Sequence, residues 1–303
     1  MAKSGIYAFG VIYQTKVVYV YQDKIGHVEK GKISIWICLS IFRVAGKMNK
    51  YFKSFLMAIS MFTIIPLPRY EWDDEGGKNI LKFYPLIGLI IGLIWYGVFK
   101  LFNLLNASIM VTSAITLITP FILTGMLHLD GYMDVCDALL SRRDKQEKLR
   151  ILKDPHTGAF AVISVVMLFI VNFSAINTII SNTIILNYNS ALGLILIPII
   201  SRSLMGYLLI SKESMKGSSL GAFFKRGTGD VDKVILLTSL LISSLILIFI
   251  FGVYGLIISL GMNLISLYFV NNAIKEFDGM SGDSAGYGLV IAETVGILIL
   301  SFI

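Results

Sequence analysis

Residues 234–270 read VILLTSLLISSLILIFIFGVYGLIISLGMNLISLYFV, an apolar stretch that contains no charged side chain. An α-helix crosses the roughly 30 Å hydrocarbon core of a bilayer with about 20 apolar residues. The stretch is therefore too long for one transmembrane helix and has the length of two. Gly252 and Gly255 lie near its middle, where glycine favours a turn. The sequence thus predicts a helical hairpin that crosses a membrane twice.

Similar apolar runs recur through most of the 303 residues, of which 56% are hydrophobic and 15% charged. A soluble domain of this length needs more charge to cover its surface, so the composition indicates an all-α, polytopic integral membrane helical bundle. Seven runs have the length of a transmembrane helix, at residues 83–101, 107–127, 158–180, 188–210, 234–251, 255–270 and 285–303. A shorter run at residues 55–67 ends at Pro66 and Pro68 and is predicted to be a re-entrant or interfacial segment.

The basic residues that give the chain its net charge of +7 cluster between predicted spans. One group follows the second span and another follows the fourth: Arg142, Arg143, Lys145, Lys148, Arg150 and Lys153, then Lys212, Lys216, Lys225, Arg226 and Lys233. The connections at residues 103–106, 181–187 and 252–255 carry no charge. Because basic loops remain in the cytosol, alternating spans place every charged loop on the cytosolic side of the cell (inner) membrane. The lipid bilayer thus accounts for the positive charge, and no nucleic-acid partner is expected.

The N-terminal 47 residues differ from the rest because long apolar runs are few there. Two interpretations are open: residues 1–47 are a dispensable extension of a membrane domain at 48–303, or residues 33–44 form a short interfacial helix. The two cysteines, Cys38 and Cys136, cannot make a disulfide framework and lie in no metal-ligand spacing.

The strongest candidate site is residues 124–137, TGMLHLDGYMDVCD. Asp130, Asp134 and Asp137 fall at i, i+4 and i+7, on one face of a helix, where like charges repel unless something neutralises them. Mg²⁺ prefers oxygen ligands and often combines one or two carboxylates with substrate phosphates. The alternative is a solvated acidic helix start with Asp130 as its N-cap. His128 is a candidate base or ligand, with an interfacial histidine as the alternative.

A second acidic segment, residues 278–283, lies at the start of the last predicted span. Asp283 is a candidate helix cap, and Gly282 permits close approach of the backbone to a phosphate. Glu293 and Arg202 lie inside predicted spans, where ionisable groups are costly and are functional candidates by default. The alternative is that these two residues pair with each other.

Three further residues are candidates for ligand binding. Asp154 and Gly158 lie where the first basic loop re-enters the membrane, and an ordinary helix-entry acid is the alternative for Asp154. Gly221 belongs to the segment 216–224, KGSSLGAFF, in the second basic loop. Its glycines and flanking cations suit a phosphate, although a flexible cytosolic loop explains them as well.

Three of these segments together resemble a known family. In order and spacing, residues 127–137, 153–158 and 281–286 resemble the signatures of the cobalamin synthase family, the adenosylcobinamide-GDP ribazoletransferases. The likeness begins near residue 48, includes residues 62–68 and 84–88, and runs to the C-terminus. Several motif positions differ from the common family residue without removing an acid: Met126, Tyr132, Met133, Cys136, Pro155, His156 and Tyr287.

The resemblance implies an enzyme for the last assembly step of cobalamin (vitamin B12) synthesis. Such an enzyme joins adenosylcobinamide-GDP to α-ribazole or its 5′-phosphate, releases GMP and requires Mg²⁺. On this hypothesis Asp130, Asp134 and Asp137 hold Mg²⁺ on the diphosphate, and Asp283 or Asp278 completes the site. His128 or one of the carboxylates then accepts the proton of the ribazole hydroxyl.

Other functions stay open at this stage. In a secondary transporter, Arg202 and Glu293 would line an ion path. A membrane phosphotransferase of the CDP-alcohol type is disfavoured because residues 134–138 lack that family's Gly and Ala-Arg pattern. A scaffold for other corrin-pathway enzymes, and a homo-oligomer, are further alternatives.

Overall fold

The computed structural model describes residues 49–67, 74–185, 189–218, 223–225 and 227–303. Within these ranges the chain is helical and forms no strand, apart from a single parallel bridge between Ser214 and Met280. The predicted extension at residues 1–47 and the candidate Gly221 lie outside the described residues.

Six described helices are long and apolar enough to cross a membrane. They are α5 (Tyr84–Leu104), which follows the short η1 (Ile80–Phe83), α9 (Ala159–Ile185), α10 (Gly193–Ser211), which follows η2 (Ser190–Leu192), α12 (Asp230–Phe251), α13 (Val253–Phe277) and α14 (Gly282–Leu300). The pair α6 (Ile109–Leu123) and α7 (Leu127–Leu140) is apolar enough only when taken together, and its bend makes it a broken span or a re-entrant loop. The predicted polytopic helical bundle is confirmed.

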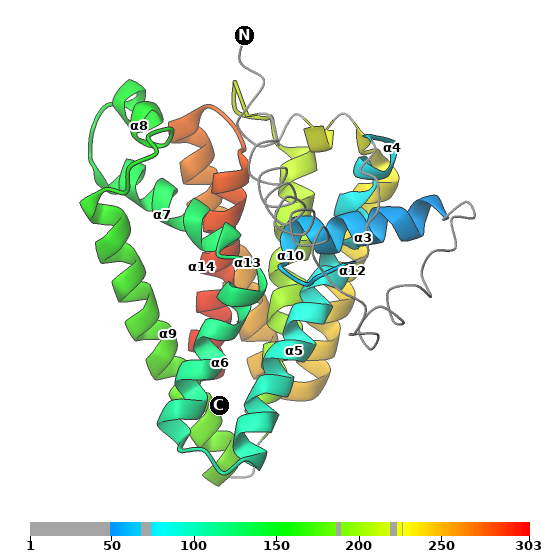
Figure 1. The fold of residues 1–303 in the computed structure, drawn as a ribbon, viewed down its shortest axis with the longest axis vertical. Coiled ribbons are helices and arrows are strands. Elements are labelled where there is room, and N and C mark those ends of the chain that lie inside the picture. The colour runs from blue at the N-terminus through cyan, green and yellow to red at the C-terminus, as the bar shows by residue number, and fades with distance from the viewer. Residues whose placement is uncertain (1–48, 68–73, 186–188, 219–222, 226) are drawn as a thin grey trace, which may run out of the picture.

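The predicted span at residues 107–127 is wrong at its C-terminal end, because helix α6 stops at Leu123. Gly125 and Met126 both adopt left-handed backbone angles, with φ of 58° and 63°, which no helix can continue through. The chain therefore bends by 90° between α6 and α7. As a result, α7 runs across one end of the bundle instead of along its axis (Figure 1).

The connections sort to opposite ends of the bundle by charge. Helix α8 (Lys145–Ile151), helix α4 (Asp74–Gly77) and the α13–α14 connection lie at one end, at the top of Figure 1, whereas the α5–α6 turn and the C-terminal end of α9 lie at the other. The α12–α13 hairpin turns at Gly252, as predicted, with φ of 60°. The charged connections that the structure describes therefore share one side, which we call the charged end, and α7 lies there.

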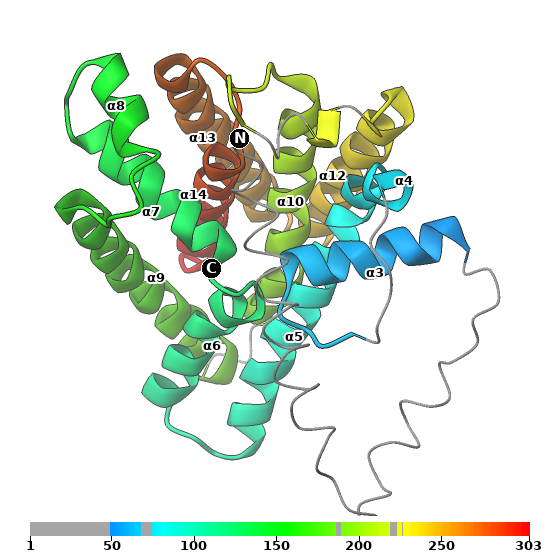
Figure 2. The same ribbon diagram turned by 45° about the horizontal axis from the view of Figure 1, so that its top comes forward.

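The short segment predicted at residues 55–67 is found as helix α3, which has different bounds (Lys50–Phe62). It is amphipathic: Met57 and Phe62 are buried, and the Phe62 ring lies 4.4 Å from that of Tyr84, while Tyr51 on the other face is exposed. It lies across helix α5 in both views (Figures 1 and 2). The backbone amide of Ile64 then donates to the Leu123 carbonyl at 2.8 Å, which ties the following segment to the α6–α7 bend.

Helices α5 and α10 pack backbone to backbone in the centre of the bundle. Gly88 and Gly92, four residues apart, face α10, and a Cβ on Gly92 would lie 2.8 Å from the Ile195 Cα. A Cβ on Gly88 would lie equally close to the Ile199 Cα. Small residues at this spacing allow close helix approach in membranes, where packing replaces the hydrophobic effect as the driving force.

We therefore expect Gly92→Ala to push α5 away from α10 and lower the melting temperature of the purified protein in detergent. Gly97→Ala is the matched control, because it lies on the same helix and its added Cβ would meet no atom within 4 Å. Alanine improves helix propensity by about 0.5–1 kcal/mol over glycine, so the control should be unchanged or more stable. Equal melting temperatures for the two variants would contradict the packing described here.

Candidate functional site at the charged end

Helix α7 carries the three predicted aspartates and packs closely against the start of α14. A Cβ on Gly131 of α7 would lie 2.9 Å from the Asp283 Cα, and one on Gly286 of α14 would lie 3.0 Å from the His128 carbonyl oxygen. Each helix thus presents a glycine to the backbone of the other. This contact brings Asp283 to the acidic face of α7, although more than 140 residues separate them in sequence.

The four carboxylates form one electrostatic cluster. Asp134 lies within electrostatic range of Asp130, Asp283 and Asp137, and Asp283 lies within range of Asp130. Asp130 is exposed and the other three are half-buried. No ion pair among the described residues involves any of the four. Unneutralised carboxylates this close repel one another, so the cluster favours a bound cation.

The donor set of this cluster suits Mg²⁺ shared with a phosphate. Within the described ranges, no three His, Cys, Asp or Glu side chains are arranged to hold a metal ion by themselves. Mg²⁺ does not need such a cage, because it usually binds one or two carboxylates together with waters and phosphate oxygens. Asp130, Asp134 and Asp283 offer oxygens of this kind.

Asp137 differs from the other three because its hydrogen-bond partner belongs to another long helix, whereas Asp283 accepts locally from the Ser281 hydroxyl at 3.5 Å. Its Oδ1 accepts a hydrogen bond of 3.3 Å from the backbone amide of Ala161, in the first turn of α9. Gly158, just before that helix, contacts the same carboxylate, and an added Cβ there would collide with both carboxylate oxygens. The structure therefore places the predicted residue Gly158 against Asp137.

His128 is buried between helices and does not face the open side of the cluster. Its side chain is 7% exposed, and its Nε2 lies 2.9 Å from the Tyr84 hydroxyl at the start of α5. The other nitrogen, Nδ1, is buried without a hydrogen-bond partner among the described residues. Sequence reasoning assigned no role to Tyr84, since 44 residues separate it from His128 and no local pattern links them.

Two predicted helix caps are wrong. Asp130 lies within the first turn of α7, and the N-cap position belongs to Met126. At α14 the cap is Ser281, whose hydroxyl accepts from the Ser284 amide at 3.1 Å, and Asp283 lies inside the helix. In both cases the acid lies beyond the cap position, inside its helix.

Asp278, the alternative metal ligand to Asp283, forms an ion pair with Lys145 of α8. A second pair joins Lys148 to Glu276 at 2.7 Å. These pairs fix α8 on the C-terminal end of α13. Asp278 is thus engaged by a cation, whereas no described cation pairs with Asp283.

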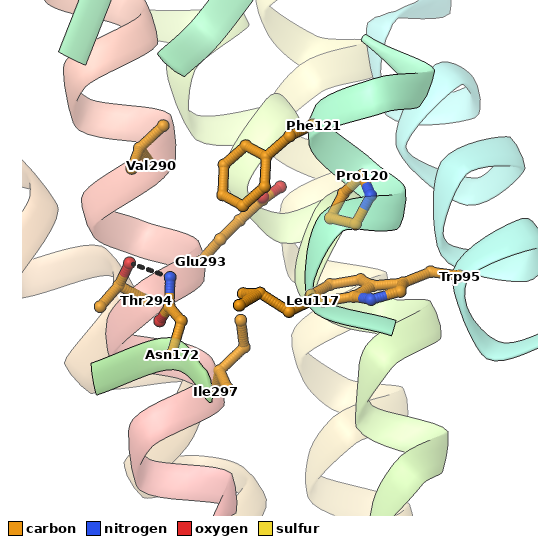
Figure 3. Close-up of a pocket in the computed structure, with 9 residues that line it drawn as sticks. All are labelled: Trp95, Leu117, Pro120, Phe121, Asn172, Val290, Glu293, Thr294 and Ile297. Atoms are coloured by element: carbon orange, nitrogen blue, oxygen red, sulfur yellow. Dashed lines mark hydrogen bonds between the residues drawn. The ribbon is translucent and has the colours of Figure 1, made fainter. Parts of the chain in front are cut away.

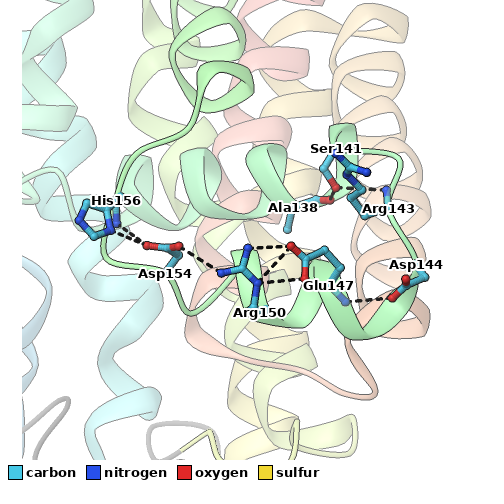
Figure 4. Close-up of polar contacts among 8 residues, drawn as sticks. All are labelled: Ala138, Ser141, Arg143, Asp144, Glu147, Arg150, Asp154 and His156. Carbon is cyan, nitrogen blue, oxygen red and sulfur yellow. Dashed lines mark hydrogen bonds and ion pairs between the residues drawn. The ribbon is translucent and has the colours of Figure 1, made fainter.

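Asp154 lies in the connection between α8 and α9, where Figure 4 shows it between His156 and Arg150. Its Oδ1 accepts from the His156 backbone amide at 3.0 Å and lies 2.7 Å from the imidazole Nδ1. These hydrogen bonds, the backbone one first, lower the pKa of Asp154. Arg150 in turn forms an ion pair with Glu147 at 2.7 Å. The structure therefore places Asp154 in a local polar turn.

The second basic loop meets the acidic segment directly. The Met215 amide donates to the Met280 carbonyl at 3.0 Å, and the Met280 amide donates to the Glu213 carbonyl at 2.7 Å. Gly279, with φ of 143°, makes room for the Met215 backbone. Gly282 begins α14 at this junction. The predicted phosphate cradle at 216–224 lies partly outside the described residues.

Arg202 and Glu293 pair with each other in the bundle interior. Arg202 on α10 is fully buried, and its Nη1 donates to Glu293 Oε1 on α14 at 2.6 Å. The Ser201 hydroxyl donates to the same oxygen at 2.9 Å. The structure thus matches the pairing alternative, and Ser201 is a partner that sequence reasoning missed.

Glu293 also lines a small cavity of about 10 Å³, roughly the size of one water site. Figure 3 shows that Asn172 of α9, which donates to Thr294 at 3.2 Å, borders the same space. The remaining lining is apolar and comes from α5, α6 and α14: Trp95, Leu117, Pro120, Phe121, Val290 and Ile297. The cavity is far too small for a nucleotide.

The fold and the site together define this chain as a polytopic helical membrane protein with an acidic cluster at its charged end. Within that class, the chain belongs to the cobalamin-5-phosphate synthase family, whose sequence profile matches residues 54–301. All four clustered aspartates lie inside the matched region. No solved structure shows a significant similarity to the chain.

Curated relatives carry the name adenosylcobinamide-GDP ribazoletransferase. The protein from Clostridium perfringens (strain SM101 / Type A) is 51% identical over 256 residues, 84% of this chain and 100% of the relative. The protein from Clostridium botulinum (strain Alaska E43 / Type E3) is 49% identical, over 82% of this chain and 97% of the relative. The protein from Brevibacillus brevis is 32% identical with the same coverage.

We expect Glu293→Ala to strand the Arg202 charge in the apolar interior and to destabilise the protein by roughly 3–5 kcal/mol. Thermal unfolding in detergent measures this loss. The double variant Arg202→Met with Glu293→Met should recover most of the stability, because apolar replacement of both partners removes both charges. A double variant as unstable as the single one would show that the ion pair is not the cause.

Proposed function

We propose that this chain is an adenosylcobinamide-GDP ribazoletransferase, which joins adenosylcobinamide-GDP to α-ribazole or its 5′-phosphate and releases GMP. This is the final assembly step of cobalamin synthesis. The observation that carries the proposal is the match of the cobalamin-5-phosphate synthase family to residues 54–301. Relatives about half identical over more than four-fifths of the chain bear this enzyme's name.

The reaction suits the acidic cluster at the charged end. The ribazole hydroxyl oxygen forms a bond to the phosphorus next to the cobinamide, and the bond from that phosphorus to the oxygen of the leaving GMP breaks. Asp134 and Asp283 would hold Mg²⁺ against the diphosphate. When bound, the ion would offset charge on the attacking and leaving oxygens. The protein's main contribution is to position two substrates for in-line displacement.

A carboxylate is the better acceptor for the hydroxyl proton. A general base must reach the proton it removes. His128 is enclosed and occupied on one side by Tyr84, whereas Asp130 is exposed at the same end of the molecule. Asp130 is therefore our candidate base, and His128 is assigned to the contact between α5 and α7.

In this proposal the reaction site lies on the cytosolic side of the inner membrane. Its support is the charge on the connections, since basic loops stay on the cytosolic side. Both substrates are highly polar and would reach the cluster without crossing the bilayer.

Asp134→Asn removes the carboxylate that interacts with all three other acids. Loss of a residue that merely supports a metal ligand costs roughly 10- to 100-fold in activity, so the loss of Asp134 should cost more. GMP release from membranes given both substrates, with and without Mg²⁺, measures the effect. Chelation with EDTA should stop release by the unaltered protein, and added Mg²⁺ should restore it.

Asp230→Asn is the matched control, because Asp230 is an exposed acid at the same end and pairs only with Lys233 among the described residues. Its activity should stay close to that of the unaltered protein. Undiminished GMP release by Asp134→Asn would refute the assignment of the cluster. Release of CMP from a CDP-linked substrate would point instead to the other phosphotransferase class.

Cysteine labelling tests the orientation. In a background with Cys38→Ser and Cys136→Ser, we expect a membrane-impermeant maleimide to label Leu104→Cys on intact cells, because Leu104 is 78% exposed at the uncharged end. Asp230→Cys, at the charged end, should be labelled only after the membrane is permeabilised. The reverse pattern would place the cluster outside the cell.

A further inference from the structure

Helix α9 begins without a side-chain cap of its own. The first backbone amides of a helix lack intrahelical partners and carry partial positive charge. In the 27-residue helix α9 the residue that precedes the first turn is Gly158, which has no side chain to accept from them. The acceptor comes from α7 instead, since Asp137 Oδ1 receives the Ala161 amide at 3.3 Å.

The fit between Asp137 and Gly158 is steric as well as electrostatic. A Cβ on Gly158 would overlap the Asp137 carboxylate, so the acid can enter the helix end only while residue 158 is glycine. An aspartate and a glycine 21 positions apart in sequence thus form one contact.

Asp137 also lies at the edge of the acidic cluster. The contact at Gly131 brings Asp283 to the N-terminal half of α7, whereas Asp137 lies about two turns further along α7 and contacts α9. Asp283 and Asp130 therefore lie toward one end of the acidic face, and Asp137 lies at the other end, toward α9.

We propose that Asp137 is a positioning residue that caps α9 and fixes the loop 141–158 beside the reaction site, and that it is not a metal ligand. The loop is then held at two points: α8 is joined to α13 by the Lys145–Asp278 and Lys148–Glu276 pairs, and the loop's end is held by Asp137. The division of roles among the acids rests on the proposed function.

Asp137→Asn separates the two roles, because asparagine caps a helix about as well as aspartate but lacks the charge a metal ligand needs. We expect GMP release within about threefold of the unaltered protein and an unchanged Mg²⁺ concentration for half-maximal rate. Asp137→Ala should lower the melting temperature and increase proteolysis of the loop 141–158. Asp134→Asn should lose GMP release at an unchanged melting temperature.

Gly158→Ala should behave like Asp137→Ala, because the new methyl group displaces the carboxylate. Gly229→Ala is its matched control, since Gly229 also precedes a long helix at the charged end and an added Cβ there meets nothing within 4 Å. This control should show the unaltered melting temperature and proteolysis pattern.

An Asp137→Asn protein with a normal melting temperature and a raised Mg²⁺ requirement would overturn the inference, and the proposed function would stand. If the unaltered protein released no GMP, the proposed function would fail on its own. The melting and proteolysis measurements on Asp137→Ala and Gly158→Ala would still decide whether the cap exists. Normal stability in both variants would refute it.

Discussion

The site depends on the backbone contact between α7 and α14. Gly131 and Gly286 each leave space for the partner's backbone, so the helices approach more closely than side chains would permit. This contact positions Asp283 beside the acids of α7, so that the two signature segments form one surface. A larger residue at either glycine would separate the carboxylates by the width of a side chain.

Bringing like charges together costs free energy, and the surroundings of the cluster reflect that cost. The nearby acids Asp278 and Glu276 are neutralised by lysines of α8, and the buried Glu293 is neutralised by Arg202. Asp130, Asp134 and Asp283 have no such partner among the described residues. The surrounding acids Asp278, Glu276 and Glu293 are thus neutralised, whereas Asp130, Asp134 and Asp283 are left available for a cation from outside.

The membrane architecture was largely predictable because length and charge decide it. Runs of about 20 apolar residues predicted the spans, and the alternation of charged and uncharged loops predicted which connections share an end. The break after Leu123 was not predictable from hydropathy, since the apolar run continues to residue 127 and only the left-handed angles at Gly125 and Met126 reveal it.

The candidate site was predictable in composition and less so in its internal contacts. The i, i+4, i+7 spacing placed three aspartates on one helix face, and family resemblance added Asp283. The partners of individual groups come from distant elements: Tyr84 for His128, and Ala161 for Asp137. Glycine offered the one usable signal, because Gly131, Gly158 and Gly286 all lie inside the quoted motifs and all mark close approaches.

The shortness of α6 has a consequence for the lipid around it. Fifteen residues rise about 22 Å, which is less than the roughly 30 Å thickness of the hydrocarbon layer. Such a mismatch is relieved by local thinning of the bilayer. Thinning of the leaflet where α6 gives way to α7 would bring lipid headgroups toward the row of aspartates, so that bilayer thickness bears on the geometry of the site.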